Sequence, residues 1–142
     1  MTKQVWINLP IKDVRRSKAF YQALGFKIGS GHGNGDEMAE LLIGEPPVAV
    51  MLFPESAFEK FTNCKIADSI NRAEVLFSIY ADSREEVDEM AKKAVNAGGT
   101  VFGEPGESDG WMYGCGFADP DGHRWNMLYM DINKAPKAAI TE

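Results

Sequence analysis

The sequence predicts an α+β protein made of two modules, each with one strand, one helix and three further strands in that order. Three observations support this prediction. Strand-like segments in which apolar side chains alternate occur in both halves of the chain. Each half has one amphipathic helical segment with capping residues, and the order of the segments repeats. The predicted parts of this single domain are module one (about 4–53), a connector (54–72), module two (about 73–131) and a C-terminal tail (132–142).

Module one opens with a predicted strand over Val5–Ile11, in which apolar residues recur at every second position. Asp13 is a favourable N-cap for a helix over Val14–Leu24. Gly25 follows at once and is typical of a helix C-terminus. The helix therefore presents one apolar stripe, which consists of Val14, Ser17, Phe20, Tyr21 and Leu24.

Three strands complete module one. They are predicted over Phe26–Ser30, Glu37–Ile43 and Val48–Phe53, and the turn residues Gly44–Pro47 separate the last two. The connector contains a predicted short helix over Glu55–Phe61.

Module two repeats this order. A predicted strand over Glu74–Ala81 precedes Ser83 and Glu86, whose spacing forms a capping box for a helix that runs to Asn96. Gly98 then ends the helix.

The end of module two is a predicted hairpin. A short strand over Thr100–Gly103 and an acidic, glycine-rich loop over Glu104–Gly110 come first. Trp111–Ala118 and Arg124–Met130 then read as two strands, because the intervening Asp119–Gly122 has strong turn chemistry.

One face of each predicted sheet has no helix to cover it. Alternation along the last strand places Asn126 on this face, as a polar group among apolar ones. Such a face is poor solvent-facing surface, so it is expected to curve around a ligand, another chain or the other module. Its predicted members are Trp6, Asn8, Met51, Glu74, Ser78 and Asn126.

Composition restricts the class of protein. The 142 residues are enough for one sizeable core, and 44% hydrophobic with 25% charged residues is typical of a soluble globular protein. A net charge of −6 argues against nucleic acid or an anionic membrane as a partner. The two cysteines are too few for a disulfide framework, and no secretory signal is evident. We therefore expect a cytoplasmic protein with reduced thiols.

Two segments, Asn8–Phe26 and Phe117–Asp131, make the chain similar to the vicinal oxygen chelate superfamily, which includes glyoxalase I, bleomycin-resistance proteins and extradiol dioxygenases. The resemblance covers about Val5–Asp131 and is nearest to a bacterial group of predicted lactoylglutathione lyases. It implies that the two βαβββ modules form a U-shaped mixed sheet around a cleft. It also implies a homodimer and a small-molecule substrate or ligand.

Metal-using members of this superfamily hold a divalent cation with His and Glu from four strands. The resemblance places those four positions on Trp6, Met51, Glu74 and Asn126. An indole cannot bind a hard cation, a thioether is a soft ligand, and an amide supplies one neutral oxygen. Glu74 is thus the one weak metal candidate; a divalent metal is possible but disfavoured, and the cofactor is unknown.

Each candidate site residue has two interpretations. Glu74 is a candidate catalytic base if it is buried in the cleft, and otherwise a solvated residue at a strand end. Asn126 either orients a ligand or is a satisfied core amide. The remaining candidates line a substrate pocket or pack in the core or a dimer interface. These residues are Trp6, Asn8, Met51, Trp111 and Tyr113.

Three functions follow from these interpretations. The first is a glyoxalase-like lyase or isomerase, with Glu74 as base or residual ligand and Asn126 as a polar anchor. The second is a metal-free protein that sequesters a small, partly aromatic compound. The third is a purely structural dimer without a ligand.

Overall fold

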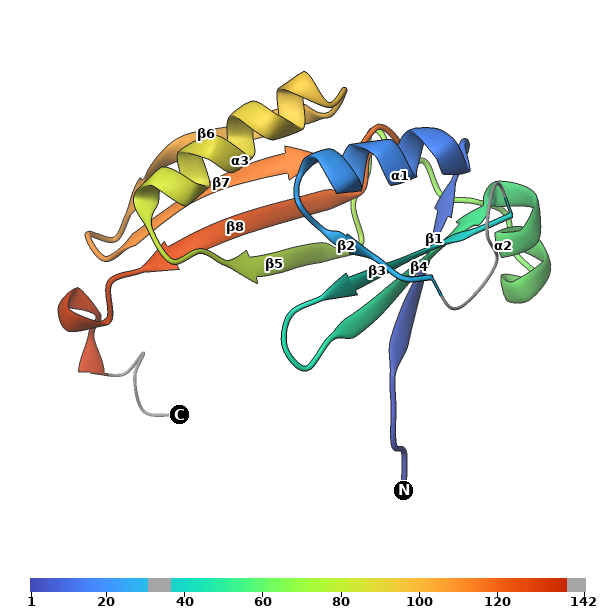
Figure 1. Ribbon diagram of the computed structural model, residues 1–142, viewed down its shortest axis with the longest axis horizontal. Helices are drawn as coiled ribbons and strands as arrows, with labels where there is room; N and C mark the ends of the chain where they lie inside the picture. The colour runs from blue at the N-terminus through green and yellow to red at the C-terminus, as the bar shows by residue number, and fades with distance from the viewer. Residues whose placement is uncertain (31–36, 138–142) are drawn as a thin grey trace. The chain divides into compact units, whose positions relative to one another are not determined.

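A computed structural model describes residues 1–30 and 37–137 of the chain (Figure 1). The chain divides into two compact units, Met1–Arg72 and Ala73–Glu142, and each holds one four-stranded mixed sheet. The predicted α+β class and the two βαβββ modules are therefore confirmed. Residues 132–137 of the predicted tail contain one turn of 3₁₀ helix, Ile132–Lys134, and the rest of the tail lies outside the described residues.

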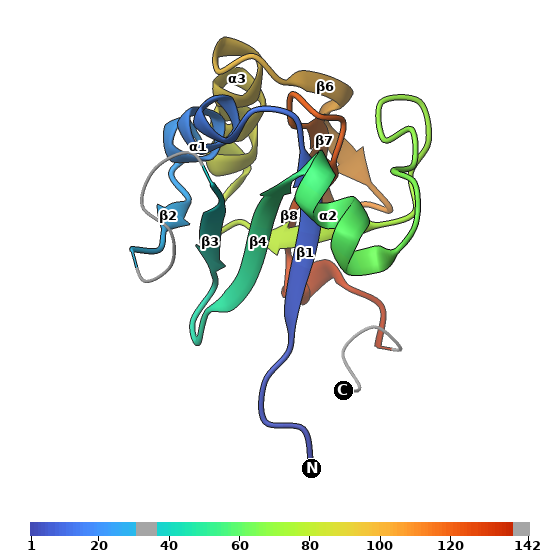
Figure 2. The same cartoon turned by 90° about the vertical axis from the view of Figure 1, so that its right-hand side faces the viewer.

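The sheet of the first unit has the strand order β1-β4-β3-β2 (Figure 2). Strands β1 and β4 run parallel, and the other pairs are antiparallel. The elements are β1 (Trp6–Ile11), α1 (Val14–Ala23), β2 (Lys27–Ile28), β3 (Ala39–Ile43), β4 (Val48–Pro54) and α2 (Glu55–Thr62).

Helix α1 begins and ends where its capping residues predict. The Asp13 side chain accepts a hydrogen bond from the Arg16 backbone N–H at 3.2 Å. Gly25 has a φ of +94°, and the Phe26 N–H reaches back to the Tyr21 carbonyl. The helix packs its apolar stripe on one face of the sheet (Figure 1). The buried core includes Leu9, Ile11, Val14, Ser17, Phe20, Tyr21, Leu24, Ala39, Leu41, Val50 and Leu52.

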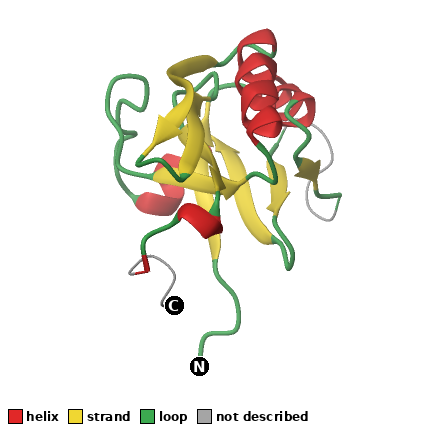
Figure 3. Cartoon of the chain, turned by 90° about the vertical axis from the view of Figure 1, so that its left-hand side faces the viewer, coloured by secondary structure: helices red, strands yellow, loops and turns green. Residues whose placement is uncertain are grey.

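The second unit has the strand order β5-β8-β7-β6, with β5 and β8 parallel. Figure 3 shows its strands in yellow and its helix in red. The elements are β5 (Leu76–Tyr80), α3 (Arg84–Asn96), β6 (Thr100–Ser108), β7 (Met112–Ala118) and β8 (Arg124–Met130).

Helix α3 covers one face of this sheet and contacts β6, β7 and β8. The predicted capping box is present, because the Ser83 hydroxyl accepts from the Glu86 N–H at 3.1 Å. Under the helix, the Trp125 indole is 1% exposed and lies 4.7 Å from the Phe77 ring, between centroids. It also stacks on Phe117. Val87, Met90, Ala91 and Ala94 of α3 are buried above this aromatic cluster.

In module one, the strands predicted over Phe26–Ser30 and Glu37–Ile43 are shorter, Lys27–Ile28 and Ala39–Ile43. Two predicted boundaries in module two were also wrong. The segment Glu104–Gly110 is not a loop, because β6 continues to Ser108 and pairs with β7 through register shifts between Val101 and Gly106. Bulges let a glycine-rich strand stay paired while it bends. The turn is confined to Asp109–Trp111, where Asp109 has a φ of +55°. At the other end of the module, the strand predicted from Glu74 begins only at Leu76.

The turn between β7 and β8 is held by a buried carboxylate. Asp119 is 3% exposed, and its Oδ1 accepts hydrogen bonds from the backbone N–H groups of Asp121 at 3.0 Å and His123 at 2.8 Å. The Asp119 N–H in turn donates to the His123 carbonyl at 2.9 Å. These bonds fix where β8 starts.

Within the described residues, no helix combines the length and the apolar character that crossing a bilayer requires.

Replacing Asp119 tests the importance of this turn. In Asp119→Ala one buried and one partly buried N–H group lose a charged acceptor, so we expect the free energy of unfolding to fall by roughly 2–4 kcal/mol. Asp119→Asn keeps an acceptor oxygen and should lose less than half as much. Urea denaturation monitored by circular dichroism measures both values. Equal losses in the two variants would contradict this role of the carboxylate.

Candidate functional site

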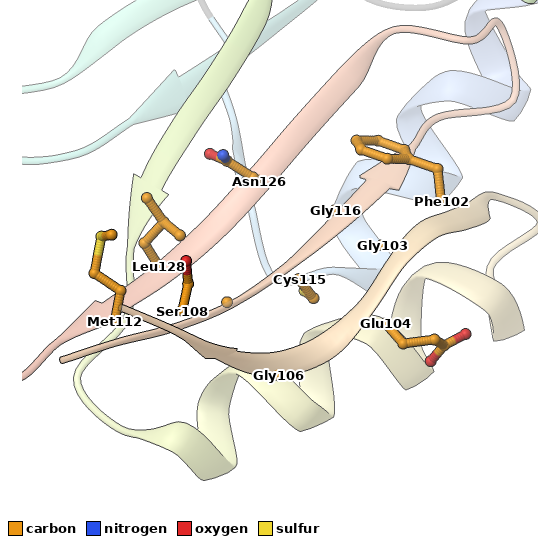
Figure 4. A pocket seen from close by; sticks show the side chains of 11 residues that line it. Phe102, Gly103, Glu104, Gly106, Ser108, Met112, Cys115, Gly116, Asn126 and Leu128 are labelled. Atoms are coloured by element: carbon orange, nitrogen blue, oxygen red, sulfur yellow. The ribbon is translucent and has the colours of Figure 1, made fainter. Parts of the chain in front are cut away.

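The helix-free face of the second sheet carries a pocket of about 430 Å³ (Figure 4). Because successive side chains of a strand point to opposite faces, this pocket and the buried core lie on opposite sides of the sheet. The side chains of Asn126 and Leu128 of β8 project away from α3, whereas Cys115 of β7 points toward the helix. The pocket is lined by Phe102, Gly103, Glu104, Gly106, Ser108, Met112, Gly114, Cys115, Gly116, Asn126 and Leu128.

Asn126 is the distinctive polar group of this pocket. Its Oδ1 is buried and has no hydrogen-bond partner among the described residues. The register places it between Ser78 of β5 and Gly116 of β7. An unsatisfied buried acceptor costs roughly 1–3 kcal/mol. A ligand that supplied an N–H or O–H donor would remove that cost.

Two glycines of β7 form the centre of the pocket floor, and side chains of neighbouring strands cover both of them. A Cβ on Gly116 would overlap the ring of Phe102, which crosses this residue from β6. A Cβ on Gly114 would lie 2.5 Å from Leu128 Cδ2 and 2.8 Å from the Met127 carbonyl oxygen. The absence of a side chain at each glycine therefore makes room for the Phe102 ring over Gly116 and for the Leu128 side chain over Gly114.

Arg124 supports the wall formed by Phe102. Its guanidinium carbon lies 4.5 Å from the centroid of that ring, a favourable cation–π distance. Across residues 1–30 and 37–137, Arg124 has no carboxylate in an ion pair. Arg124 itself does not line the pocket, and the charged side chain among the lining residues is that of Glu104.

Tyr113, a predicted pocket residue, lies on the opposite face. Its hydroxyl donates to Asp88 of α3 at 2.6 Å, and this hydrogen bond raises the pKa of Tyr113. Arg84 lies over the rings of Tyr113 and Tyr129, at 5.6 and 5.3 Å, and pairs with Glu107 at 2.5 Å. The cross-strand pair Tyr113–Tyr129 fixes this placement, so Tyr113 ties α3 to the sheet and does not meet Asn126.

Glu74 and Trp111 also lie away from the pocket. Glu74 is exposed, before β5 begins, so it lacks the burial on which the general-base hypothesis depends. Trp111 lies in the turn before β7 and is half-buried; its carbonyl accepts from the Asp131 N–H at 2.7 Å.

The first unit holds the other predicted residues. Trp6 and Asn8 of β1 lie on its face opposite α1, and Asn8 pairs in register with Met51 of β4. Met51 in turn pairs with Glu40 of β3, which the sequence analysis did not single out. Trp6, Met51 and Glu40 line a pocket of about 360 Å³ within this unit.

These residues do not fit a hard divalent cation. Of the four positions implied by the resemblance, Trp6 and Met51 supply no oxygen, and Glu74 is exposed outside its strand. Asn126 alone offers a buried oxygen. Within the part of the chain that the structure describes, no three His, Cys, Asp or Glu residues lie close enough to share a metal ion.

Glu40 and Phe102 were not among the residues predicted from the sequence, whereas Gly114 and Gly116 already suggest a close approach or a bulge there. Glu40 alternates with buried Ala39 and Leu41, which signals its face once the strand is recognised. Phe102 gave no such signal, because its position over Gly116 depends on the bulges that reset the register of β6.

Comparison with known proteins agrees with this architecture. The family model of the glyoxalase/bleomycin resistance protein/dioxygenase superfamily matches residues 3–127. A comparison with curated proteins finds no match.

Solved structures of similar fold include the hypothetical protein SA1046 from S. aureus, at 36% identity and a TM-score of 0.81, with 91% of this chain and 95% of that chain covered. A glyoxalase/bleomycin resistance protein/dioxygenase family enzyme from Burkholderia phytofirmans PsJN has 19% identity, a TM-score of 0.74 and coverage of 88% and 96%. A lactoylglutathione lyase from Agrobacterium tumefaciens has 17% identity, a TM-score of 0.63 and coverage of 91% and 94%.

The floor glycines should differ in their tolerance of a methyl group. Gly114→Ala brings a Cβ against the Met127 backbone, so we expect the free energy of unfolding to drop by roughly 1–3 kcal/mol. Gly116→Ala meets only the Phe102 side chain, which is 47% exposed and is able to rotate away, so its loss should be smaller. Urea denaturation of both variants provides the comparison, and a reversed order would be inconsistent with the described floor.

The two thiols should differ in reactivity. Burial raises the pKa of Cys115 to about 11, and its Sγ donates to the Val87 carbonyl at 3.7 Å, so the thiol stays protonated near pH 8. Cys64 is exposed. Iodoacetamide at that pH should alkylate Cys64 in the folded protein and both thiols in urea, as read by peptide mass spectrometry. Rapid native alkylation of Cys115 would show that it is not sealed under α3.

Proposed function

Because the chain belongs to the glyoxalase/bleomycin resistance protein/dioxygenase superfamily, we propose that it binds a small, flat and largely apolar molecule on the helix-free face of its second unit, without a metal ion. The molecule carries an N–H or O–H donor that meets Asn126. This corresponds to the metal-free sequestering protein among the three functions expected from the sequence.

The observation that carries the proposal is the buried Oδ1 of Asn126 with no partner among the described residues. Buried side-chain acceptors are normally hydrogen-bonded, so an exception on a pocket wall is a candidate ligand contact. Figure 4 shows this side chain projecting on the same side of the sheet as Leu128 and Met112. Its environment is apolar, which strengthens a hydrogen bond to a ligand by excluding water.

The walls of the pocket define the shape of the molecule. The Phe102 ring, which lies over Gly116, offers an aromatic surface against which a planar ring can pack. Met112 and Leu128 supply flexible apolar contacts on the other side. A volume of about 430 Å³ suits one or two fused rings with small substituents.

A glyoxalase-like lyase or isomerase is the rival function. It is suggested by the family and by the similar lactoylglutathione lyase, but at 17% identity that likeness concerns the fold alone. The exposed position of Glu74 and the poor donor set at the implied metal positions give it no support. The experiments therefore include lyase or isomerase activity as an alternative outcome.

Binding of 2-naphthol tests the proposal, with 2-methoxynaphthalene as the probe that lacks the donor. We expect 2-naphthol to bind about ten-fold more tightly, as a hydrogen bond to a buried acceptor requires. Asn126→Leu should abolish this difference, and the exposed Asn96→Leu should preserve it. Isothermal titration calorimetry gives the six affinities of the two probes for the three proteins. Equal binding of both probes by the unaltered protein would overturn the proposal.

The lyase function is tested separately, with the hemithioacetal of methylglyoxal and glutathione in the presence of Ni²⁺ or Zn²⁺. We expect no isomerisation above the rate without protein. Metal-dependent turnover that is lost in Glu74→Gln would instead establish the rival and assign Glu74 as its base or ligand.

A further inference from the structure

The first unit contains a second pocket whose chemistry differs from that around Asn126. It lies on the face of the β1-β4-β3-β2 sheet opposite α1 and has a volume of about 360 Å³. Phe53, one of its lining residues, also contacts Phe61 of α2, with 5.0 Å between ring centroids. Its lining is aromatic and thioether-rich, with a single ionisable group, and all of it belongs to Met1–Arg72. The lining residues are Gln4, Trp6, Met38, Glu40, Ala49, Met51 and Phe53.

The strand order sets the distance across this pocket. Trp6 lies on β1 and Glu40 on β3, with β4 between them. Adjacent strands are about 4.8 Å apart, and the register offsets Trp6 from Glu40 by two residues along β4. The two side chains therefore rise from backbones roughly 12 Å apart. Met51 of β4 forms the floor and is 7% exposed. The gap therefore has room for one compact group between an indole and a carboxylate.

The Glu40 carboxylate is held at the β2 side of the gap. A Cβ on Gly29 would overlap this carboxylate, so the absence of a side chain at Gly29 makes the space that it occupies. Glu40 is half-buried, and it has no ion-pair partner within residues 1–30 and 37–137. A partly buried anion without a protein cation favours a positively charged ligand.

The Trp6 side chain is also suited to binding a positively charged group. Its side chain is 55% exposed although it is the largest apolar group on this face. The face of an indole is the strongest cation–π partner among protein side chains, especially where water is excluded. Met38, Met51 and Phe53 would contact the alkyl groups that surround a quaternary or substituted nitrogen.

We propose that this pocket binds an organic cation, with its ammonium group between the Trp6 indole and the Glu40 carboxylate. The site is formed by the first unit alone and does not depend on the function proposed for the Asn126 pocket. Charge and shape act together in it: Glu40 selects a cation, and the indole and thioethers select an alkylated one over a small hydrated ion.

Choline and 3,3-dimethyl-1-butanol test this proposal, because they share a shape and differ in charge. We expect choline to shift the Trp6 indole N–H resonance in a nitrogen-15 correlation spectrum at millimolar concentrations, and to bind at least about ten-fold more tightly than the neutral alcohol. The indole signals of Trp111 and Trp125 should not move. Equal affinity for the two probes, or no shift at Trp6, would overturn the proposal.

Three variants test whether the Glu40 carboxylate and the Trp6 indole bind the cation. Glu40→Gln and Trp6→Leu should each weaken choline binding by about ten-fold or more. Glu45→Gln, an exposed carboxylate in the turn between β3 and β4, should leave it unchanged. Neither Glu40 nor Trp6 lies in the buried core, so all three proteins are expected to fold, as circular dichroism will check. A loss of affinity in Glu45→Gln as large as in Glu40→Gln would mean that net charge, not this pocket, attracts the cation.

These variants also separate this proposal from the one for the second unit. Glu40→Gln and Trp6→Leu should bind 2-naphthol as the unaltered protein does, and Asn126→Leu should bind choline normally. Choline binding that disappears in Asn126→Leu but persists in Glu40→Gln would assign the cation to the other pocket and refute the inference.

Discussion

The burial of the Trp125 indole beneath α3 is the constraint on which the second unit depends. The ring packs between Phe77 and Phe117 and is 1% exposed. Because successive side chains of a strand point to opposite faces, a buried Trp125 places Asn126 on the face that α3 leaves uncovered. A slip of one residue would put the amide in the core and the indole in water. The packing of the apolar core therefore fixes the position of Asn126 as firmly as it fixes the positions of the core residues themselves.

The same pleat organises the first unit but presents different chemistry. Leu9 and Leu52 are buried under α1, so Trp6 and Met51 lie on the uncovered face. Each of the two pocket-bearing faces has few polar groups, and these lie among apolar neighbours. One face offers a neutral acceptor in Asn126, and the other offers a carboxylate. Repetition of the βαβββ module therefore repeats the scaffold without repeating the site.

Local signals in the sequence predicted much of this fold. Asp13 and Ser83 begin their helices because a short oxygen-bearing side chain satisfies a free backbone N–H, and this needs only neighbouring residues. The turn held by Asp119 is local for the same reason. The extent of β6 was not predictable in this way, since glycine-rich sequence is typical of loops and only pairing with β7 keeps it extended.

By itself, the sequence determined the order of the elements, their caps and the face on which Asn126 lies, because each follows from periodicity or from contacts within a few residues. Only the tertiary structure decided which side chains meet. Tyr113 joins Asp88 across the sheet from Asn126, and Phe102 crosses Gly116 from another strand. Such contacts depend on the register between strands and on bulges within them, and these are settled when distant segments pack together.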